Sequence, residues 1–354
     1  MMVQSVVAGV LLLAHAQATP QTIANQERQE VNQQSPRRKV VFVAGPRSHG
    51  YGAHEHNAGS LLLARLLKEH HKQIDVVVHQ NGWPSDLNAF DGADAVVIFS
   101  NGGINHPAIP HLAALNRVLE RGAGLVLLHY AVEVPVDSGG KEFLDWAGGH
   151  FAINWSVNPV WTMKSNEFPR HPITRGVLPY EINDEWYYHM RFREGMRGVQ
   201  PILSALPPES SLSRPDGLHS GNPHVRAAVL ERKEPQHLAW AAERPNGGRG
   251  FGFTGAHFHW NWGHPMQRRL VLNAIAWAAH AEVPPNGIEV GVLTMEDLEA
   301  NQDDNKPANF DRERWRLLIE QWQRAGGPPP RSPETAQTHM RTGGAGAADR
   351  TKTY

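Results

Sequence analysis

The sequence predicts an α/β fold in which helices cover both faces of a parallel sheet. Short, continuous apolar runs are typical of strands buried on both faces, and they occur at residues 40–44, 74–78, 95–99 and 124–129. Apolar residues recur at helical spacing between these runs, at residues 58–67 and 110–120. Strands that alternate with helices indicate crossover connections, and such connections join parallel strands.

The second half of the chain is less regular. Further strands are predicted at residues 160–164, 227–230, 238–241 and 250–255. Loops rich in proline and glycine separate them, notably residues 201–223, and residues 183–189 have no clear period. Two further helices are predicted, at residues 266–280 and 311–324. The 354 residues are enough for one large domain or two ordinary ones.

The first 18 residues have features of a secretory signal. An apolar run spans residues 6–14, and Ala14, Ala16 and Ala18 offer small-residue cleavage sites. No Lys or Arg precedes the run, which departs from the usual signal pattern. The run is too short to cross a bilayer as a helix. We therefore expect an exported protein, secreted or periplasmic, that has no membrane association after the signal is cleaved.

The chain is expected to have five parts. These are a signal peptide at residues 1–18, a linker rich in Gln, Asn and Glu at 19–37, an α/β domain at 38–282, a C-terminal extension with one helix at 283–325, and a disordered tail at 326–354.

The composition excludes several kinds of function. A formal net charge of -1 argues against a nucleic-acid partner. The chain has no cysteine, which excludes disulfides, a cysteine nucleophile and thiolate metal ligands. Residues 45–50 match neither GxxxxGK[ST] nor GxGxxG, so we expect no nucleotide cofactor. The 21 histidines suit metal or proton chemistry, and the 11 tryptophans suit stacking on sugar rings or ordinary packing.

Histidines and carboxylates follow several of the predicted strands. The carboxyl ends of parallel strands lie at one edge of a sheet, where ligands bind in open α/β folds. The candidates are His49, His54, Glu55 and His56 after the first strand, His129 at the end of the fourth, Asp184 and Glu185 in the irregular segment, and His257 and His259 after the last strand. Each has a structural alternative: a histidine bonded to backbone, a carboxylate satisfied in a turn, or, for Glu55, a favourable place at a helix N-terminus.

Several of these motifs, in this order and spacing, resemble the ThuA-like (trehalose-utilisation) family. The segments that carry the resemblance are residues 48–52 and 54–59, the strand that ends at His129, residues 148–151, residues 184–187, and the strand at 248–251 that leads to His257. The resemblance covers about residues 38–280. It implies the fold of the class I glutamine amidotransferases, a flavodoxin-like, doubly wound and mostly parallel sheet.

The resemblance also limits the activity. Amidotransferases use a cysteine at the turn after a central strand, but here the matching strand ends in His129 and no cysteine is present. Glutaminase activity is therefore excluded. The family is associated with catabolism of trehalose and related disaccharides, in part through 3-keto sugars, which implies a carbohydrate substrate. The predicted export signal departs from the pattern of the family. The resemblance therefore does not imply an intracellular role in trehalose use for this chain.

We assign hypothetical roles on this basis. The acid–base residues are His129, Glu185 and His257, and the metal ligands are His49, His54, His56 and His259. The substrate contacts are His150, Trp186, Tyr187, Trp260 and Trp262, with Trp155 as a further stacking candidate. Core packing is an equal alternative for each tryptophan.

The hypothesis is an exported enzyme that acts on a glycoside or 3-keto sugar, as a hydrolase or lyase. Histidine and carboxylate would move the protons, and a divalent transition metal, zinc or manganese, would assist. The alternative is a sugar- or partner-binding module that has lost catalysis, since function belongs to sites and not to folds. The sequence leaves open which sugar is used and whether the chain forms a homo-oligomer.

Overall fold

A computed structural model describes residues 36–86 and 88–324. The chain divides into two units, Met1–Arg37 and Arg38–Tyr354, and every element below belongs to the second. The predicted signal peptide, the predicted linker except residues 36 and 37, and the predicted tail lie outside the described residues. In the described part of the chain, no helix is both long enough and apolar enough to cross a membrane.

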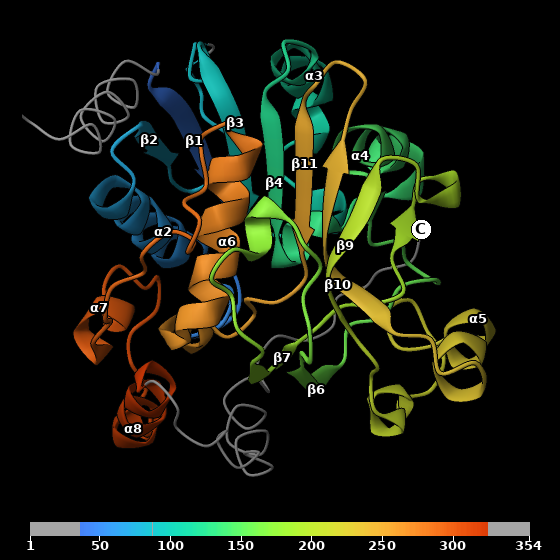
Figure 1. Cartoon of the computed structure of the whole chain (residues 1–354). Helices are drawn as coiled ribbons and strands as arrows, with labels where there is room; N and C mark the ends of the chain where they lie inside the picture. The colour runs from blue at the N-terminus through green and yellow to red at the C-terminus, as the bar shows by residue number, and fades with distance from the viewer. Residues whose placement is uncertain (1–35, 87, 325–354) are drawn as a thin grey trace, which may run out of the picture. The chain divides into compact units, whose positions relative to one another are not determined.

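Seven of the described strands form one sheet, in the order β2-β1-β3-β4-β11-β10-β9 (Figure 1). Their bounds are Arg38–Ala44 (β1), Ile74–His79 (β2), Ala93–Phe99 (β3), Gly124–Leu128 (β4), Val199–Ala205 (β9), Gln236–Glu243 (β10) and Arg249–Phe253 (β11). The first five strands in that order are parallel, and β10 and β9 extend the sheet antiparallel. The parallel part has the strand order of flavodoxin-like folds, which confirms the predicted fold class.

Side chains alternate between the two faces of each central strand. Val40 and Phe42 of β1 belong to one hydrophobic cluster, whereas Val41 and Val43 belong to the other. The first cluster includes helices α2 (His56–His70) and α6 (Pro265–Ala278), and the second includes α3 (Leu112–Glu120) and α4 (Lys141–Ala147). The sheet is therefore covered on both faces, as continuous apolar strands require (Figure 1).

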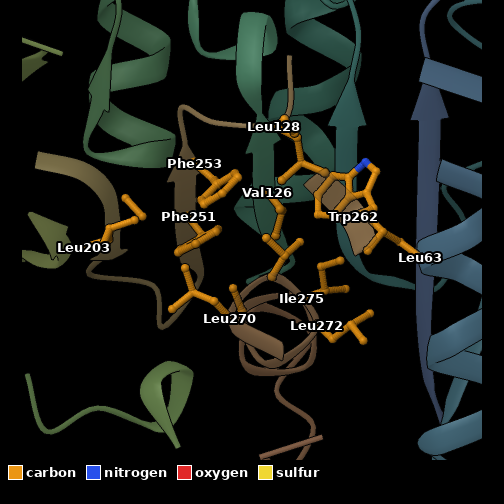
Figure 2. Packing of buried hydrophobic residues seen from close by; sticks show 14 of the residues in the cluster. Leu63, Val126, Leu128, Leu203, Phe251, Phe253, Trp262, Leu270, Leu272 and Ile275 are labelled. Carbon is orange, nitrogen blue, oxygen red and sulfur yellow. The ribbon is translucent and has the colours of Figure 1, made fainter. Parts of the chain in front are cut away.

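Helix α6 supplies the centre of the first cluster. Its Leu270 and Ile275 lie beside Val126 of β4 and Phe251 of β11, and all four side chains are fully buried (Figure 2). Fully burying one such side chain contributes about 1.5–3 kcal/mol. This packing fixes β4 and β11 as neighbours, and both strands lead to candidate site residues.

The second half contains most of the differences from the predicted elements. The prediction of a strand at residues 227–230 is wrong. Those residues form a π-helical turn, Ala227–Glu231, that continues helix α5 (Pro223–Arg226). Asn222 caps α5 by accepting a hydrogen bond from the Val225 N–H at 3.0 Å, and Pro223 occupies the first turn. These signals for the start of a helix outweigh the short apolar run at residues 227–230, which alone would favour a strand.

Two small sheets lie outside the main one. The predicted strand β6 (Val160–Lys164) pairs antiparallel with β7 (Glu181–Glu185), which ends in the segment expected to be irregular. The other pair is β5 (Gly149–His150) with β8 (Arg191–Phe192). In the C-terminal extension, the expected helix is present as α8 (Arg312–Gln323), and a short helix α7 (Met295–Glu299) precedes it.

Candidate functional site

His129 turns the chain sharply at the end of β4. Its φ of 54° lies in the left-handed region, which is rare for a residue other than glycine and costs about 1–3 kcal/mol. The side chain is fully buried, and Nδ1 donates to the Thr254 carbonyl oxygen at 2.8 Å. Because Nδ1 then carries the proton, the Nε2 lone pair of the neutral ring is directed to other partners.

His54 lies in the loop between β1 and α2, and this loop is joined to the segment after β11. The His54 N–H donates to the His257 carbonyl at 3.0 Å, and the His259 N–H donates to the Gly52 carbonyl at 2.9 Å. His54 also has a left-handed φ, 51°, and its side chain is 2% exposed. Two segments about 200 residues apart in sequence therefore present their histidines together.

Asp184 holds the segment that carries His257. Its carboxylate accepts hydrogen bonds from the N–H groups of Ala256 at 2.7 Å and Phe258 at 3.2 Å, and it is completely buried. Ala256 has a φ of 84°, so this turn needs such support. Because Asp184 precedes Glu185 at the end of β7, the same contacts place Glu185 beside His257.

Three imidazole nitrogens and one carboxylate oxygen converge at this point. His54 Nε2 lies 2.9 Å from His257 Nδ1 and 3.1 Å from His129 Nε2. Glu185 Oε2 lies 3.1 Å from His257 Nδ1 and 3.5 Å from His129 Nε2. The Tyr187 hydroxyl lies 3.2 Å from His129 Nε2. We call His54, His129, Glu185 and His257 the His3Glu cluster.

The His3Glu cluster could hold a metal ion. Its four ligand atoms all lie within 4.8 Å of one another. Two atoms bound to a tetrahedral zinc at about 2.0–2.1 Å would lie roughly 3.4 Å apart, close to the spacing found here. Neutral ring nitrogens at about 3 Å repel each other unless a proton or a cation lies between them. The bond from His129 Nδ1 to a backbone carbonyl is the support that metal-binding histidines usually have.

The electrostatics favour the protonation states that a metal site needs at Glu185 and His54, but favour the protonated form of His257. Burial disfavours the charge on Glu185, but His257 and His129 outweigh it and hold the pKa of this carboxyl well below its usual range. Burial, together with the neighbouring His129 and His257, lowers the pKa of His54 well below 6.5. Burial opposes the charged form of His257 as well, yet the Glu185 carboxylate raises its pKa. Glu185 is therefore ionised and His54 neutral near pH 7, as a metal site requires, whereas His257 has to lose its proton when it binds a metal.

A cavity of about 340 Å³ opens beside the cluster, within the range of small-ligand sites. The residues that line it are His49, His54, Tyr130, Asn158, Glu185, Tyr187, Arg214 and His219. The His49 ring stacks on the His54 ring, with centroids 3.7 Å apart. Arg214 donates to Asn158 Oδ1 at 2.8 Å and to the His219 carbonyl at 3.2 Å. The cavity therefore joins the cluster to a set of polar groups that suit a hydroxylated ligand.

A family model described as ThuA, trehalose utilisation, matches residues 39–278, which include every residue named so far in the cluster and the cavity. The chain belongs to the ThuA family. It is similar to solved ThuA-like proteins from Bacteroides uniformis (17% identity, TM-score 0.46, covering 69% of this chain and 92% of that one) and Parabacteroides merdae (14% identity, TM-score 0.46, covering 74% and 99%). Comparison with curated proteins gives no match.

In this ThuA chain, the residues that converge are not the set that was predicted as metal ligands. His129, Glu185 and His257, predicted as acid–base residues, join the predicted ligand His54 in the cluster. His49 lies against the cluster but is not part of it. His56 is fully buried with Nδ1 3.1 Å from the Pro46 carbonyl, and it does not belong to the group of converging ligand atoms.

His259, the fourth predicted ligand, also lies apart from the cluster. In an extended segment, His257 and His259 would share a face, because side chains alternate along a strand. Instead, a 3₁₀ turn, His259–Gly263, begins at this residue and carries its ring into the interior, 1% exposed and beside Trp260. The change of backbone conformation at this point ends the alternation, so His259 does not face the same way as His257.

The predicted tryptophan contacts are core residues of this ThuA fold. Trp186, Trp260 and Trp262 are fully buried, so their faces are not available to a sugar. Trp155 stacks on His189 at 4.5 Å, with the Arg191 guanidinium 3.3 Å above its ring, and does not line the cavity. His150 is buried as well, with Nδ1 donating to the Phe151 carbonyl at 2.9 Å. Tyr187 is the predicted substrate contact that does reach the cavity.

Sequence reasoning missed Asn158, Arg214 and His219. They come from irregular loops, where hydrophobic period gives no information on side-chain direction. Arg214 and His219 lie within the proline- and glycine-rich segment at residues 201–223, for which the sequence predicts only a connecting loop. The one available signal was the presence of a charged and an imidazole side chain in a long loop, since such loops are often functional.

Proposed function

We propose that this protein is a metal-dependent enzyme of carbohydrate catabolism that acts on a glycoside with a keto group at C3. The observation that supports the proposal most strongly is the convergence of the His3Glu cluster at a cavity of small-ligand size. Membership of the ThuA family, described as trehalose utilisation, supports the substrate class.

The ligand set suits zinc or manganese. Imidazole nitrogens are good ligands for zinc, and a carboxylate is accepted by both ions. A divalent ion held there would polarise the keto oxygen of the substrate. A keto group at C3 already acidifies the hydrogen at C2, so the protein then needs groups that move protons.

His49 is suited to accept the C2 proton. The Ser48 hydroxyl donates its single proton to Asn101 Oδ1 at 2.6 Å, so the 2.7 Å contact between Ser48 Oγ and His49 Nδ1 needs the proton on Nδ1. The Nε2 atom of His49 then has a free lone pair. Ser48 and Asn101 orient a base in this way, as a second group commonly does for a catalytic histidine.

Tyr187 is suited to donate to a substrate oxygen. Burial raises its pKa well above 10, and Glu185 and Glu133 add to the effect, so the hydroxyl keeps its proton.

In the proposed reaction the C2–H bond breaks, and the departing oxygen leaves C1 with the electron pair of its bond and takes up a proton. The product is an unsaturated keto sugar, and addition of water to it would complete a hydrolysis.

The proposal is tested with para-nitrophenyl 3-keto-glucoside and tag-free protein that is metal-loaded, chelator-treated or reconstituted. We expect nitrophenolate release well above the spontaneous rate, its loss with the metal, and its return on addition of zinc or manganese. His257→Ala should lower nitrophenolate release by at least about 10²-fold, because His257 is both a proposed metal ligand and the charge partner of Glu185. His224→Gln, an exposed histidine that does not line the cavity, is the matched control.

Two outcomes would overturn the proposal. Release no faster than the spontaneous rate by metal-loaded protein is one, and release that is indifferent to metal and to His257→Ala is the other. Reversible sugar binding without turnover would support the binding module instead.

A further inference from the structure

A second histidine–carboxylate pair lines the same cavity but lies outside the His3Glu cluster. His219 Nε2 is 3.1 Å from Glu133 Oε1. The Glu133 side chain is 5% exposed, whereas that of His219 is 32% exposed and faces the cavity. Glu133 follows the short turn after β4, four positions beyond His129. One turn of backbone therefore connects this pair to the cluster.

The position of His219 is well defined for a loop residue. Its carbonyl accepts hydrogen bonds from the Asn158 N–H at 3.0 Å and from Arg214 Nη2 at 3.2 Å. Its ring stacks on Phe151, with centroids 5.4 Å apart and planes inclined by 26°. The Gly103 N–H donates to the Glu133 carbonyl at 3.0 Å, so both partners are fixed by backbone contacts.

This arrangement leaves one ring nitrogen of His219 for another partner. Nε2 donates to Glu133, and no side chain or backbone group in the described part of the chain bonds Nδ1. A buried carboxylate that holds one nitrogen and stabilises the imidazolium, with the other nitrogen towards a cavity, is the usual arrangement of a proton-transfer histidine.

The proposed reaction needs such a group. The four members of the cluster are used as ligands, and His49 is used at C2. Of the other titratable groups that line the cavity, Arg214 does not release its proton. Tyr130 and Tyr187 carry phenols, which are intrinsically much weaker acids than an imidazolium, and the Tyr187 hydroxyl already lies 3.2 Å from His129 Nε2.

We infer that His219, oriented by Glu133, is the catalytic general acid that protonates the oxygen departing from C1, an inference that rests on the proposed function. The C1–O bond breaks, and its electron pair goes to the departing oxygen. The proton on His219 Nδ1 passes to that oxygen, which leaves the imidazole neutral until water protonates it again. Glu133 and Arg214 contact His219, and the other titratable groups of the same cavity are His49, His54, Tyr130, Glu185 and Tyr187.

The test compares two leaving groups. Para-nitrophenolate leaves without protonation, whereas methoxide does not. In metal-loaded His219→Gln, we expect kcat/KM for methyl 3-keto-glucoside to fall by about 10²–10⁴-fold, and that for para-nitrophenyl 3-keto-glucoside by less than about tenfold. Metal content and Tm should stay at the wild-type values. A residue with a merely structural role would not produce a loss that depends on the leaving group.

Two further variants complete the design. Glu133→Gln keeps an oxygen that can accept from His219 but removes the charge, so we expect a loss of roughly tenfold with the methyl substrate alone. His224→Gln should match wild type with both substrates. Equal losses on the two substrates, or none in His219→Gln or Glu133→Gln with metal retained, would overturn this inference. No turnover of either substrate by wild type would overturn the proposed function and this inference together.

Discussion

At the scale of single residues, the site depends on backbone conformations that few residues adopt. His54, His129 and Ala256 all have positive φ, and each lies within or next to the His3Glu cluster. Such conformations persist only where the surrounding structure supports them. Around His257 the support comes from Asp184, whose carboxylate accepts the N–H groups on both sides of that residue.

Asp184→Asn tests this support. The amide offers one accepting oxygen and one donating NH2, so at least one N–H of residues 256 and 258 loses its partner. We expect a loss of about 1.5–3 kcal/mol in the free energy of unfolding and a 10–100-fold lower metal affinity, measured by denaturant unfolding and by competition with a chelator. Asp145→Asn, an exposed residue on α4, is the control. Unchanged metal affinity in Asp184→Asn would show that Asp184 does not position His257.

His106 gives a separate prediction on acid stability, because it lies away from the cluster. Its ring accepts from the Ala108 N–H at 3.1 Å and donates to the Ala131 carbonyl at 3.1 Å, and burial lowers its pKa from 6.5 to about 4. Between these two pH values the unfolded chain binds a proton that the folded chain does not bind. The folded state therefore loses stability as pH falls from about 6.5 towards 4, by up to roughly 3 kcal/mol from this residue.

His106→Gln should be less stable than wild type at pH 7, because a fitted side chain is lost. Between about pH 6.5 and 4, however, its unfolding free energy should fall less steeply than that of wild type, by the same roughly 3 kcal/mol. Urea unfolding at a series of pH values measures both. Parallel curves for the two proteins would mean that His106 does not contribute to the acid sensitivity.

At the scale of elements, the C-terminal extension contacts the loop that carries His54. The Asp303 N–H donates to Glu55 Oε2 at 2.9 Å, and Gly52 donates to Gln302 Oε1 at 3.1 Å and to Glu55 Oε1 at 2.9 Å. Phe310 packs against Tyr51 and Trp260. Residues beyond the family match at 39–278 therefore help to fix a candidate ligand loop.

Glu55→Gln removes one charged acceptor from these contacts. Because Glu55 is 2% exposed and both its oxygens accept backbone N–H groups, we expect a loss of about 1.5–3 kcal/mol of stability, together with weaker metal binding through the adjacent His54. Thermal unfolding with and without metal separates the two effects. Glu69→Gln, at the exposed end of α2, should leave both unchanged. A Glu55→Gln protein with wild-type Tm and metal affinity would contradict the role of this contact.

At the scale of the whole molecule, the strand pattern predicted the fold and the edge at which candidate residues meet. Continuous apolar runs determine buried parallel strands, and topology then places the residues that follow them at one edge. Which of those residues converge was not predictable. His129 and His257 enter the cluster while His56 and His259 do not, because single backbone angles and the start of a 3₁₀ turn decide where each ring points.

The residues that line the cavity away from the cluster could not be predicted from the sequence, for a different reason. Asn158, Arg214 and His219 reach the cavity through loops, and their contacts with one another depend on long-range packing. No periodic pattern records such contacts. For the candidate stacking tryptophans, the burial of Trp186, Trp260 and Trp262 favours the alternative of core packing, which is common for large aromatic residues.

We propose that His54, His129, Glu185 and His257 together hold a metal ion. The most direct test is elemental analysis of purified, tag-free protein and of a His54→Ala/His257→Ala double variant, with His224→Gln as control. We predict close to one equivalent of zinc or manganese in wild type and control, and almost none in the double variant. Wild type that holds no metal after reconstitution, or a double variant that keeps the wild-type metal content, would contradict this proposal.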